Sequence, residues 1–317
     1  MSAKSNNQGR AYEYAWLLAL EQKLSTFKKV IVDKQGGYNA SCRAYESLEK
    51  SLQEHYLVSA KSGVLLLLDC EPLLSEMLDN SHNEIMLSLQ TDKLGEIADV
   101  RDILIHFDKF YIGLSIKHNH EAVKHSRLSK DLDFGQKWLG IGVSQNYKDT
   151  IKPLFEKLEN AKRENMLWRN FPNKEQKIYV PLLQAFKEEV LRIHENTKNK
   201  VPQKMVEYLL GKYDFYKAIL LERERKTKLE AYHFNNTLNR SVKNKPKRII
   251  PLSKLPTRII HFDFKPKSFN TLELILDEGW SFSLRIHNAS SKVEPSLKFD
   301  IKLLSMPVSV AVFMVEF

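Results

Sequence analysis

The stretch that decides the fold reads Asp99-Val100-Arg101-Asp102-Ile103-Leu104-Ile105 and, after a short turn, Gly113-Leu114-Ser115-Ile116-Lys117-His118-Asn119. Two apolar runs of strand length joined by a turn predict a β-hairpin. Asp102 opens the first strand of this hairpin. Side chains two positions apart in a strand lie on the same face, so the second strand presents Ser115 and Lys117 together.

An acid at the start of one strand and a lysine on its hairpin neighbour are typical of metal-dependent nucleases. The spacing here is Asp-x12-Ser-x-Lys, with a neutral Ser115 where the usual pattern has a second acid. A lysine near an aspartate also occurs in ordinary hairpins, so the pattern alone leaves both interpretations open. A cation bound by Asp102 would need a further carboxylate, for which Glu13 and Asp99 are the candidates. For Glu13, within a segment of helical spacing, a solvated helix carboxylate is the alternative.

The composition is that of a globular protein. Its 317 residues are 43% hydrophobic and 28% charged, enough for one large domain or two smaller ones. There is no apolar run of the length that a membrane span needs, and the polar N-terminus lacks the apolar core of a signal peptide. The two cysteines have no metal-ligand spacing and fit a reducing compartment. We therefore expect a cytoplasmic protein with no membrane partner.

Positive charge is concentrated in two places. The net charge is +10, which favours an anionic partner such as nucleic acid, although a basic protein without that role is the alternative. Lysines and arginines between residues 117 and 130 face only Glu121, an arrangement suited to binding phosphate. Residues 240–267 hold nine basic residues against Asp263 alone. A flexible solvated loop is one interpretation of this segment, and an arm that follows a DNA backbone is the one we favour.

Periodicity outlines the remaining elements. Helices are predicted over residues 9–20, 41–57, 63–78, 147–164, 180–195 and 201–210, with an interruption at Pro72 in the third and Ser144 as an N-cap of the fourth. Strands are predicted over residues 85–89, 215–221, 228–234, 258–264, 271–276, 280–287 and 297–303. The expected fold class is α/β or α+β, with a central mixed sheet flanked by helices. We expect a nuclease core with helical segments over 1–212 and a β-rich, DNA-contacting part over 213–317, or one continuous domain.

Several blocks together resemble the HaeIII-type family of type II restriction endonucleases. They are Gly9-x-Ala11-Tyr12-Glu13, Ala98 to Ile105, Ser115 to His120, Lys124 to Ser129, Phe134-Gly135-x-x-Trp138 and Phe282 to Phe299. The resemblance implies a PD-(D/E)XK-like core, dependence on Mg²⁺ and cleavage of double-stranded DNA at GGCC. It also implies a companion DNA methyltransferase that acts on the same site without a required complex. The chain departs from the broad nuclease pattern at Ser115 and in having no proline before Asp102.

The hypothesis for the site follows from the hairpin and this resemblance. Asp102, Lys117 and Glu13 are the predicted catalytic residues, and Asp102, Glu13 and the Ile116 carbonyl the predicted metal ligands. The predicted DNA contacts are Ser115, His118, Asn119, Lys124, Arg127, Arg285, Asn288, Lys292 and Lys298. Arginine and lysine read guanine through O6 and N7 in the major groove. A repair or nicking nuclease and a non-catalytic DNA-binding protein are the alternatives, and the chain is expected to be a monomer or a homodimer.

Overall fold

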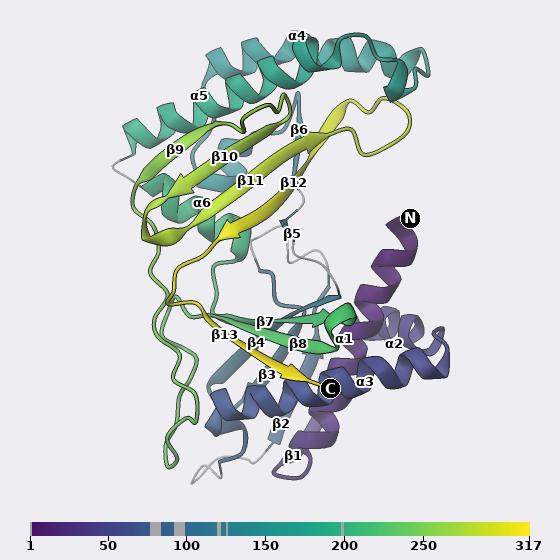
Figure 1. Cartoon of the computed structure of the whole chain (residues 1–317), viewed down its shortest axis with the longest axis vertical. Helices are drawn as coiled ribbons and strands as arrows, with labels where there is room; N and C mark the ends of the chain where they lie inside the picture. Colours follow the sequence, from purple (N-terminus) through teal and green to yellow (C-terminus); the bar gives the residue numbers. More distant parts are fainter. Residues whose placement is uncertain (1, 77–83, 92–98, 119–121, 125, 198–199) are drawn as a thin grey trace. The chain divides into compact units, whose positions relative to one another are not determined.

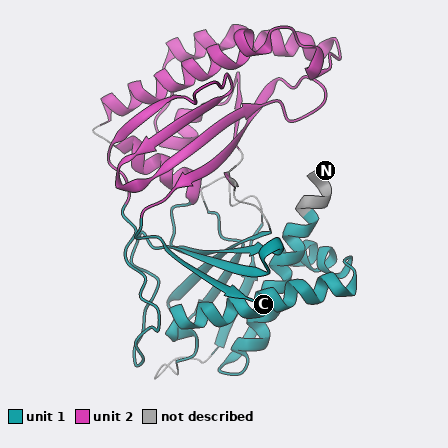
Figure 2. Cartoon of the chain, in the orientation of Figure 1, with its two compact units in different colours: residues 1–120, 211–254, 308–317 teal, residues 121–210, 255–307 magenta. Residues whose placement is uncertain are grey.

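A computed structural model describes residues 2–76, 84–91, 99–118, 122–124, 126–197 and 200–317. The chain divides into two compact units (Figure 2). Unit 1 consists of residues 1–120, 211–254 and 308–317, and unit 2 of residues 121–210 and 255–307. The division expected at residue 212 does not reproduce these units, because each of the two sheets uses strands from both sides of that position.

Unit 1 contains a seven-stranded mixed sheet with the order β1-β2-β3-β4-β7-β8-β13. The pairs β1–β2 and β4–β7 are parallel, and the other neighbours are antiparallel. This arrangement confirms the predicted mixed α/β class with a central mixed sheet. The strands are β1 (Lys29–Asp33), β2 (Glu84–Leu89), β3 (Ile103–Phe107), β4 (Phe110–His118), β7 (Phe215–Leu221), β8 (Lys226–Tyr232) and β13 (Ala311–Glu316).

The α-helices that the structure describes in unit 1 are α1 (Ser2–Leu24), α2 (Tyr38–Glu46) and α3 (Lys50–Cys70). The helices α1 and α3 cross one face of the sheet (Figure 1), and their apolar residues share one core with those of the strands. The β4 residues that belong to this core are Ile112, Leu114 and Ile116. We call the face of the sheet on which they lie the helix face. The interruption predicted at Pro72 in the helix over 63–78 is confirmed, because α3 ends at Cys70 and Pro72 starts a separate 3₁₀ turn. Residues 77 and 78 lie outside the described residues.

Unit 2 contains an antiparallel sheet with the order β5-β12-β11-β10-β9, and β6 also pairs with β12. Its strands are β5 (Ala122–Lys124), β6 (Arg127–Ser129), β9 (Ile259–Phe264), β10 (Thr271–Leu276), β11 (Ser281–His287) and β12 (Ser296–Ser305). Its helices are α4 (Gln145–Arg163), α5 (Val180–Asn196) and α6 (Lys200–Leu210). The ring of Phe186 on α5 packs edge-on against Phe262 and at a tilt against Phe299, so α5 covers one face of this sheet.

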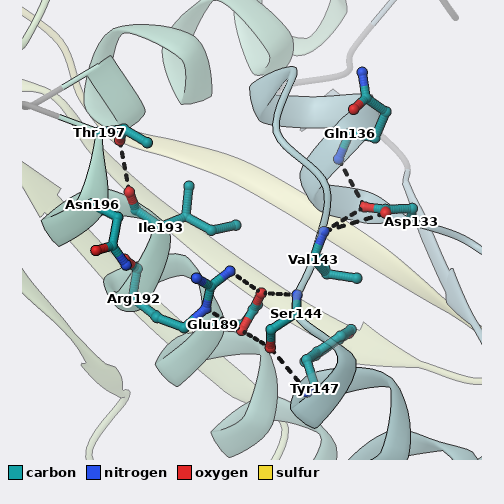
Figure 3. A network of polar contacts seen from close by, with 10 residues as sticks. All are labelled: Asp133, Gln136, Val143, Ser144, Tyr147, Glu189, Arg192, Ile193, Asn196 and Thr197. Carbon is teal, nitrogen blue, oxygen red and sulfur yellow. Dashed lines mark hydrogen bonds and ion pairs between the residues drawn. The ribbon is translucent and has the colours of Figure 1, made fainter.

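A buried carboxylate ties the helices of unit 2 together (Figure 3). Ser144 caps α4 as predicted, since its Oγ accepts a hydrogen bond from the Tyr147 N–H at 3.1 Å. Glu189 on α5 in turn accepts from the backbone N–H of Ser144 at 2.6 Å and from its hydroxyl at 2.8 Å. Arg192 donates two further bonds to Glu189, so the start of α4 is fixed to the side of α5.

None of the helices among the described residues has the length and apolar content to cross a membrane.

Candidate active site

The predicted hairpin brings Asp102 and Lys117 into direct contact. Asp102 immediately precedes β3, and Lys117 lies one residue before the end of β4. The Asp102 Oδ2 accepts from the Lys117 ammonium at 2.9 Å, from the Ile116 N–H at 2.6 Å and from the Ser115 hydroxyl at 3.3 Å. The side chains of Asp102 and Lys117 are 24% and 29% exposed, so a substrate can reach both.

Side chains of β4 alternate between the two faces of the sheet, which decides which of them lie on the same face as Lys117. Because Ile112, Leu114 and Ile116 line the helix face, Ser115 and Lys117 lie on the opposite face, which we call the Asp102 face. Ser115 is buried and its hydroxyl is bonded to Asp102. A buried hydroxyl that already orients the acid gives no support to the predicted contact between Ser115 and DNA.

The donor atoms at Asp102 fit a magnesium ion. Among the described residues, every hydrogen bond to this carboxylate goes to Oδ2, and Oδ1 accepts none. The Ile116 N–H points toward Asp102, and the N–H and C=O of one strand residue point to the same side, so the Ile116 carbonyl also faces Asp102. Mg²⁺ typically binds through one or two carboxylates with waters and substrate phosphates, which this pair of oxygen donors allows. Within the described part of the chain there is no group of three histidine, cysteine or acidic side chains that could hold a metal.

The two candidates for a second carboxylate have partners of their own. Glu13 lies on α1, which packs on the helix face, and its Oε2 accepts from the Ser41 hydroxyl at 3.2 Å. Asp99 is buried and receives two bonds of 2.7 Å from the Arg101 guanidinium, one on each oxygen. Both oxygens of Asp99 are therefore occupied, and the contact between Glu13 and Ser41 does not by itself link Glu13 to Asp102.

Three of the predicted DNA contacts lie together on the outer face of the unit 2 sheet. Leu297 and Phe299 of β12 face the helices, so Lys298 faces outward. Lys298 is paired with Arg127 on β6 and with His287 on β11. Arg285 is two residues from His287 and shares its face. Arg127 and Arg285 are exposed and bridge to Glu294 at 2.7 Å and to Asp300 at 3.2 Å. Segments more than 150 residues apart thus form one basic surface.

The other predicted DNA contacts differ in their surroundings. His118 lies on the helix face, where its Nε2 is 3.0 Å from the Tyr56 hydroxyl and 3.5 Å from the Glu222 carboxylate, and burial lowers the pKa of His118. Asn288 is buried, and both of its amide hydrogens are used in bonds to the carbonyls of Ser290 and Lys292. This gives Asn288 a role in shaping its loop rather than in reading a base.

Lys292 is exposed, and its ammonium lies 3.3 Å from the Asn165 side-chain oxygen. Lys124 is described only through its place in β5, where it pairs with Ile301. Asn119 lies outside the described residues.

The basic segment is held to unit 1 by acids that the sequence analysis did not single out. We call residues 240–248 the basic loop. The buried Glu76 accepts from the backbone N–H groups of Val242 and Asn244 at 2.9 and 2.6 Å. Asp69 binds the Lys247 ammonium at 2.8 Å. The loop is therefore anchored at defined points. The signal for this anchor in the sequence was the presence of two acids, Asp69 and Glu76, at the end of an apolar helix and just beyond it.

Two comparisons with known proteins match this chain over nearly its whole length. A sequence profile of the HaeIII restriction endonuclease family matches residues 9–307. The type II restriction enzyme HaeIII of Haemophilus aegyptius is 45% identical over 313 residues, which cover 98% of this chain and 97% of that protein. No solved structure matches the chain. These matches over nearly the whole chain define a restriction endonuclease, which is a nuclease of the phosphodiester-cleaving class. The chain belongs to the HaeIII restriction endonuclease family, and it is thus a type II site-specific deoxyribonuclease.

Proposed function

We propose that this enzyme cleaves double-stranded DNA at GGCC by Mg²⁺-dependent hydrolysis, using Asp102 and Lys117 on a PD-(D/E)XK-like core. The observation that carries the proposal is the 2.9 Å contact between the two side chains at the solvent-accessible start of β3. The mixed sheet with helices on one face supports the assignment of the core. The sequence GGCC comes from the resemblance to HaeIII.

The chemistry is hydrolysis, in which a water oxygen forms a bond to phosphorus and one bridging P–O bond breaks. Asp102 Oδ1 and the Ile116 carbonyl would hold Mg²⁺, which supplies positive charge to the phosphate and acidifies a bound water. The Ser115 and Ile116 donors keep the Asp102 carboxylate in one orientation. The Lys117 ammonium orients the attacking water and offsets the negative charge that develops on the phosphate. Glu13 remains the candidate for a further carboxylate, since Asp99 is buried and its charge is paired with the Arg101 guanidinium.

We also propose that the outer face of unit 2 contacts the DNA. Arg127, Arg285 and Lys298 supply donors suited to phosphates and to guanine edges. Because GGCC is a palindrome, a two-fold dimer would match it, and a monomer that cuts the strands in turn is the alternative. A companion methyltransferase that modifies the same site would protect the host DNA.

The test of the site uses Asp102→Asn, Lys117→Ala and Glu13→Gln, with a plasmid that contains GGCC and one that lacks it. We expect the first two variants to lose roughly 10²–10⁴-fold in cleavage rate while they still shift the DNA in a gel. Normal cleavage by either variant would contradict the assignment. Near-normal Mg²⁺-dependent cutting by Glu13→Gln would indicate that Glu13 is a solvated helix carboxylate and not a metal ligand.

Sequencing the ends made by the native enzyme separates the proposed function from its alternatives. Discrete double-strand ends at GGCC are the expected product. Nicks at lesions or mismatches indicate a repair nuclease, and a shifted but intact plasmid indicates DNA binding alone.

A second test concerns base recognition. Arg285→Ala is expected to cost about 1–3 kcal/mol at the cognate site and to relax the preference among sequences if Arg285 reads a guanine. A loss of affinity that is equal for all sequences would assign Arg285 to a phosphate instead. Exposed Lys152 on α4, changed to alanine, serves as the control.

A further inference from the structure

A second lysine, Lys217 on β7, lies on the Asp102 face of the unit 1 sheet. In the parallel β4–β7 pair Lys217 is the register partner of Ser115, and in the β7–β8 pair it is the partner of Glu230. Register partners place their side chains on the same face. Ser115, Lys217 and Glu230 therefore form a row across three strands, and Asp102 continues it through its bond to Ser115.

This row is buried although it is polar. Lys217 is 7% exposed, and Ser115 and Glu230 are less exposed still. Placing a lysine in the interior costs several kcal/mol unless nearby groups compensate its charge. Glu230 also binds Lys228 at 2.7 Å and the Tyr232 hydroxyl at 2.9 Å, so its charge is shared among several donors. Lys217 therefore adds a positive charge to the face of the sheet that carries Asp102 and Lys117.

Because Ser115 is neutral, the positive charge of Lys217 can act on the neighbouring Asp102. A glutamate in its place would put a negative charge between Lys217 and Asp102, whereas a short neutral side chain adds no charge of its own. Lys117 is paired with Ile219, so Lys217 is its diagonal neighbour on the same face. Adjacent strands are about 4.8 Å apart, and long side chains reach diagonal positions. In a low-dielectric interior a charge at such a distance acts strongly on a reacting group.

We infer that Lys217 is an electrostatic positioning residue of the active site, which stabilises the negative charge that develops on the scissile phosphate in the transition state. It acts from within the sheet, beside Asp102, Ser115 and Lys117, and it adds its positive charge to that of Lys117. The inference rests on the proposed role of Asp102 and Lys117 as the cleavage site.

The experiment compares single-turnover cleavage and DNA affinity for Lys217→Met, Lys217→Arg and the control Lys228→Met. Lys228 lies on the same face and contacts Glu230. Lys228→Met therefore removes one positive charge from this face, as Lys217→Met does, but from the neighbouring strand β8. We expect Lys217→Met to cleave on the order of 10- to 100-fold more slowly with an unchanged dissociation constant for DNA. Lys217→Arg should recover most of the rate, and Lys228→Met should cleave within a few-fold of the native enzyme. If Lys217→Met does not fold, Lys217→Gln takes its place.

Two outcomes would overturn the inference. One is cleavage at the native rate by Lys217→Met, and the other is an equal loss of rate in the Met and Arg variants, which would indicate packing rather than charge. Asp102→Asn and Lys117→Ala are assayed alongside. If those two variants are inactive and Lys217→Met is fully active, only this inference fails, whereas active Asp102→Asn and Lys117→Ala variants reject the proposed cleavage site itself.

Discussion

At the scale of single residues, the contact between Asp102 and Lys117 could be predicted because it is local. A hairpin fixes the relation between its two strands, and the alternation of β4 follows from its apolar residues. The bond from Ser115 to Asp102 could not be predicted, since it depends on the rotamers of the folded state. The surroundings of Glu13 depend on how α1 packs against α2, which a single helix pattern does not specify.

Glu71 gives a pH-dependent prediction at this scale. It is 1% exposed, its Oε1 accepts from the Tyr216 hydroxyl and from the Asn239 N–H, each at 2.6 Å, and burial raises the pKa of Glu71 to about 7. The folded state therefore binds this proton more tightly than the unfolded chain does. The resulting stabilisation is complete below the ordinary glutamate pKa of about 4.3 and is lost as the pH rises through 7.

We expect the free energy of unfolding to fall by up to about 3 kcal/mol between pH 4.5 and 8 from this group alone. Glu71→Gln keeps an oxygen acceptor and cannot titrate, so its stability should change less over the same range. Urea titrations at several pH values measure the difference. Identical pH profiles for the native protein and Glu71→Gln would contradict the prediction.

At the scale of elements, patterns with a clear period were predicted well. The helix over 180–195 and the strands over 215–221 and 271–276 agree with α5, β7 and β10 to within one residue. The predicted helix over 41–57 is wrong as one element, because the chain breaks after Glu46 and α3 starts at Lys50. The strands β1 and β13 were not predicted. Their Val, Ile and Phe residues are typical of strands, so local propensity was an available signal for both.

The basic loop supports a prediction about DNA affinity. Its backbone is anchored by Glu76, so its exposed lysines are presented at a fixed place. Changing Lys243, Lys245 and Lys247 to glutamine should weaken binding to all sequences alike. The slope of log K against log salt should fall by about 0.9 for each phosphate that the variant no longer neutralises.

The control for the basic loop is the same change at Lys148, Lys152 and Lys157, three exposed lysines of α4. It lowers the net charge equally. If both triple variants show the same decrease in affinity and slope, the net charge of the protein and not the basic loop determines binding.

At the scale of the whole molecule, each unit is assembled from separate parts of the chain. The sequence could not reveal this, because composition reports on neighbours along the chain whereas strand pairing joins residues far apart. Asp102 and Lys117 belong to unit 1, and Arg127, Arg285 and Lys298 belong to unit 2. The residues proposed to cut and those proposed to recognise DNA are thus supported by different sheets, and substitutions should affect them separately.

Removal of the last ten residues tests whether unit 1 needs β13 for its stability. These residues contain β13, which pairs with β8 over six residues, and Phe313 and Val315 pack against the core of unit 1. A chain that ends at Pro307 should unfold at a lower urea concentration and lose cleavage, because the edge of β8 and part of the core are uncovered. Met314→Thr, on the exposed side of β13, is the control and should retain both properties. An unchanged urea midpoint in the shortened chain would show that β13 is dispensable.

The parallel pairing of β4 with β7 has a consequence for the order in which the enzyme is made. Lys117 leaves the ribosome soon after Asp102, but its strand partner Ile219 is synthesised 102 residues later, and β13 comes last. Contacts between such distant residues form late, after the intervening chain has emerged. A nascent chain therefore carries the residues proposed to cut DNA long before it can hold them in a finished sheet. Translation itself is therefore expected to delay the appearance of an active nuclease until the strands of unit 1 have all been made.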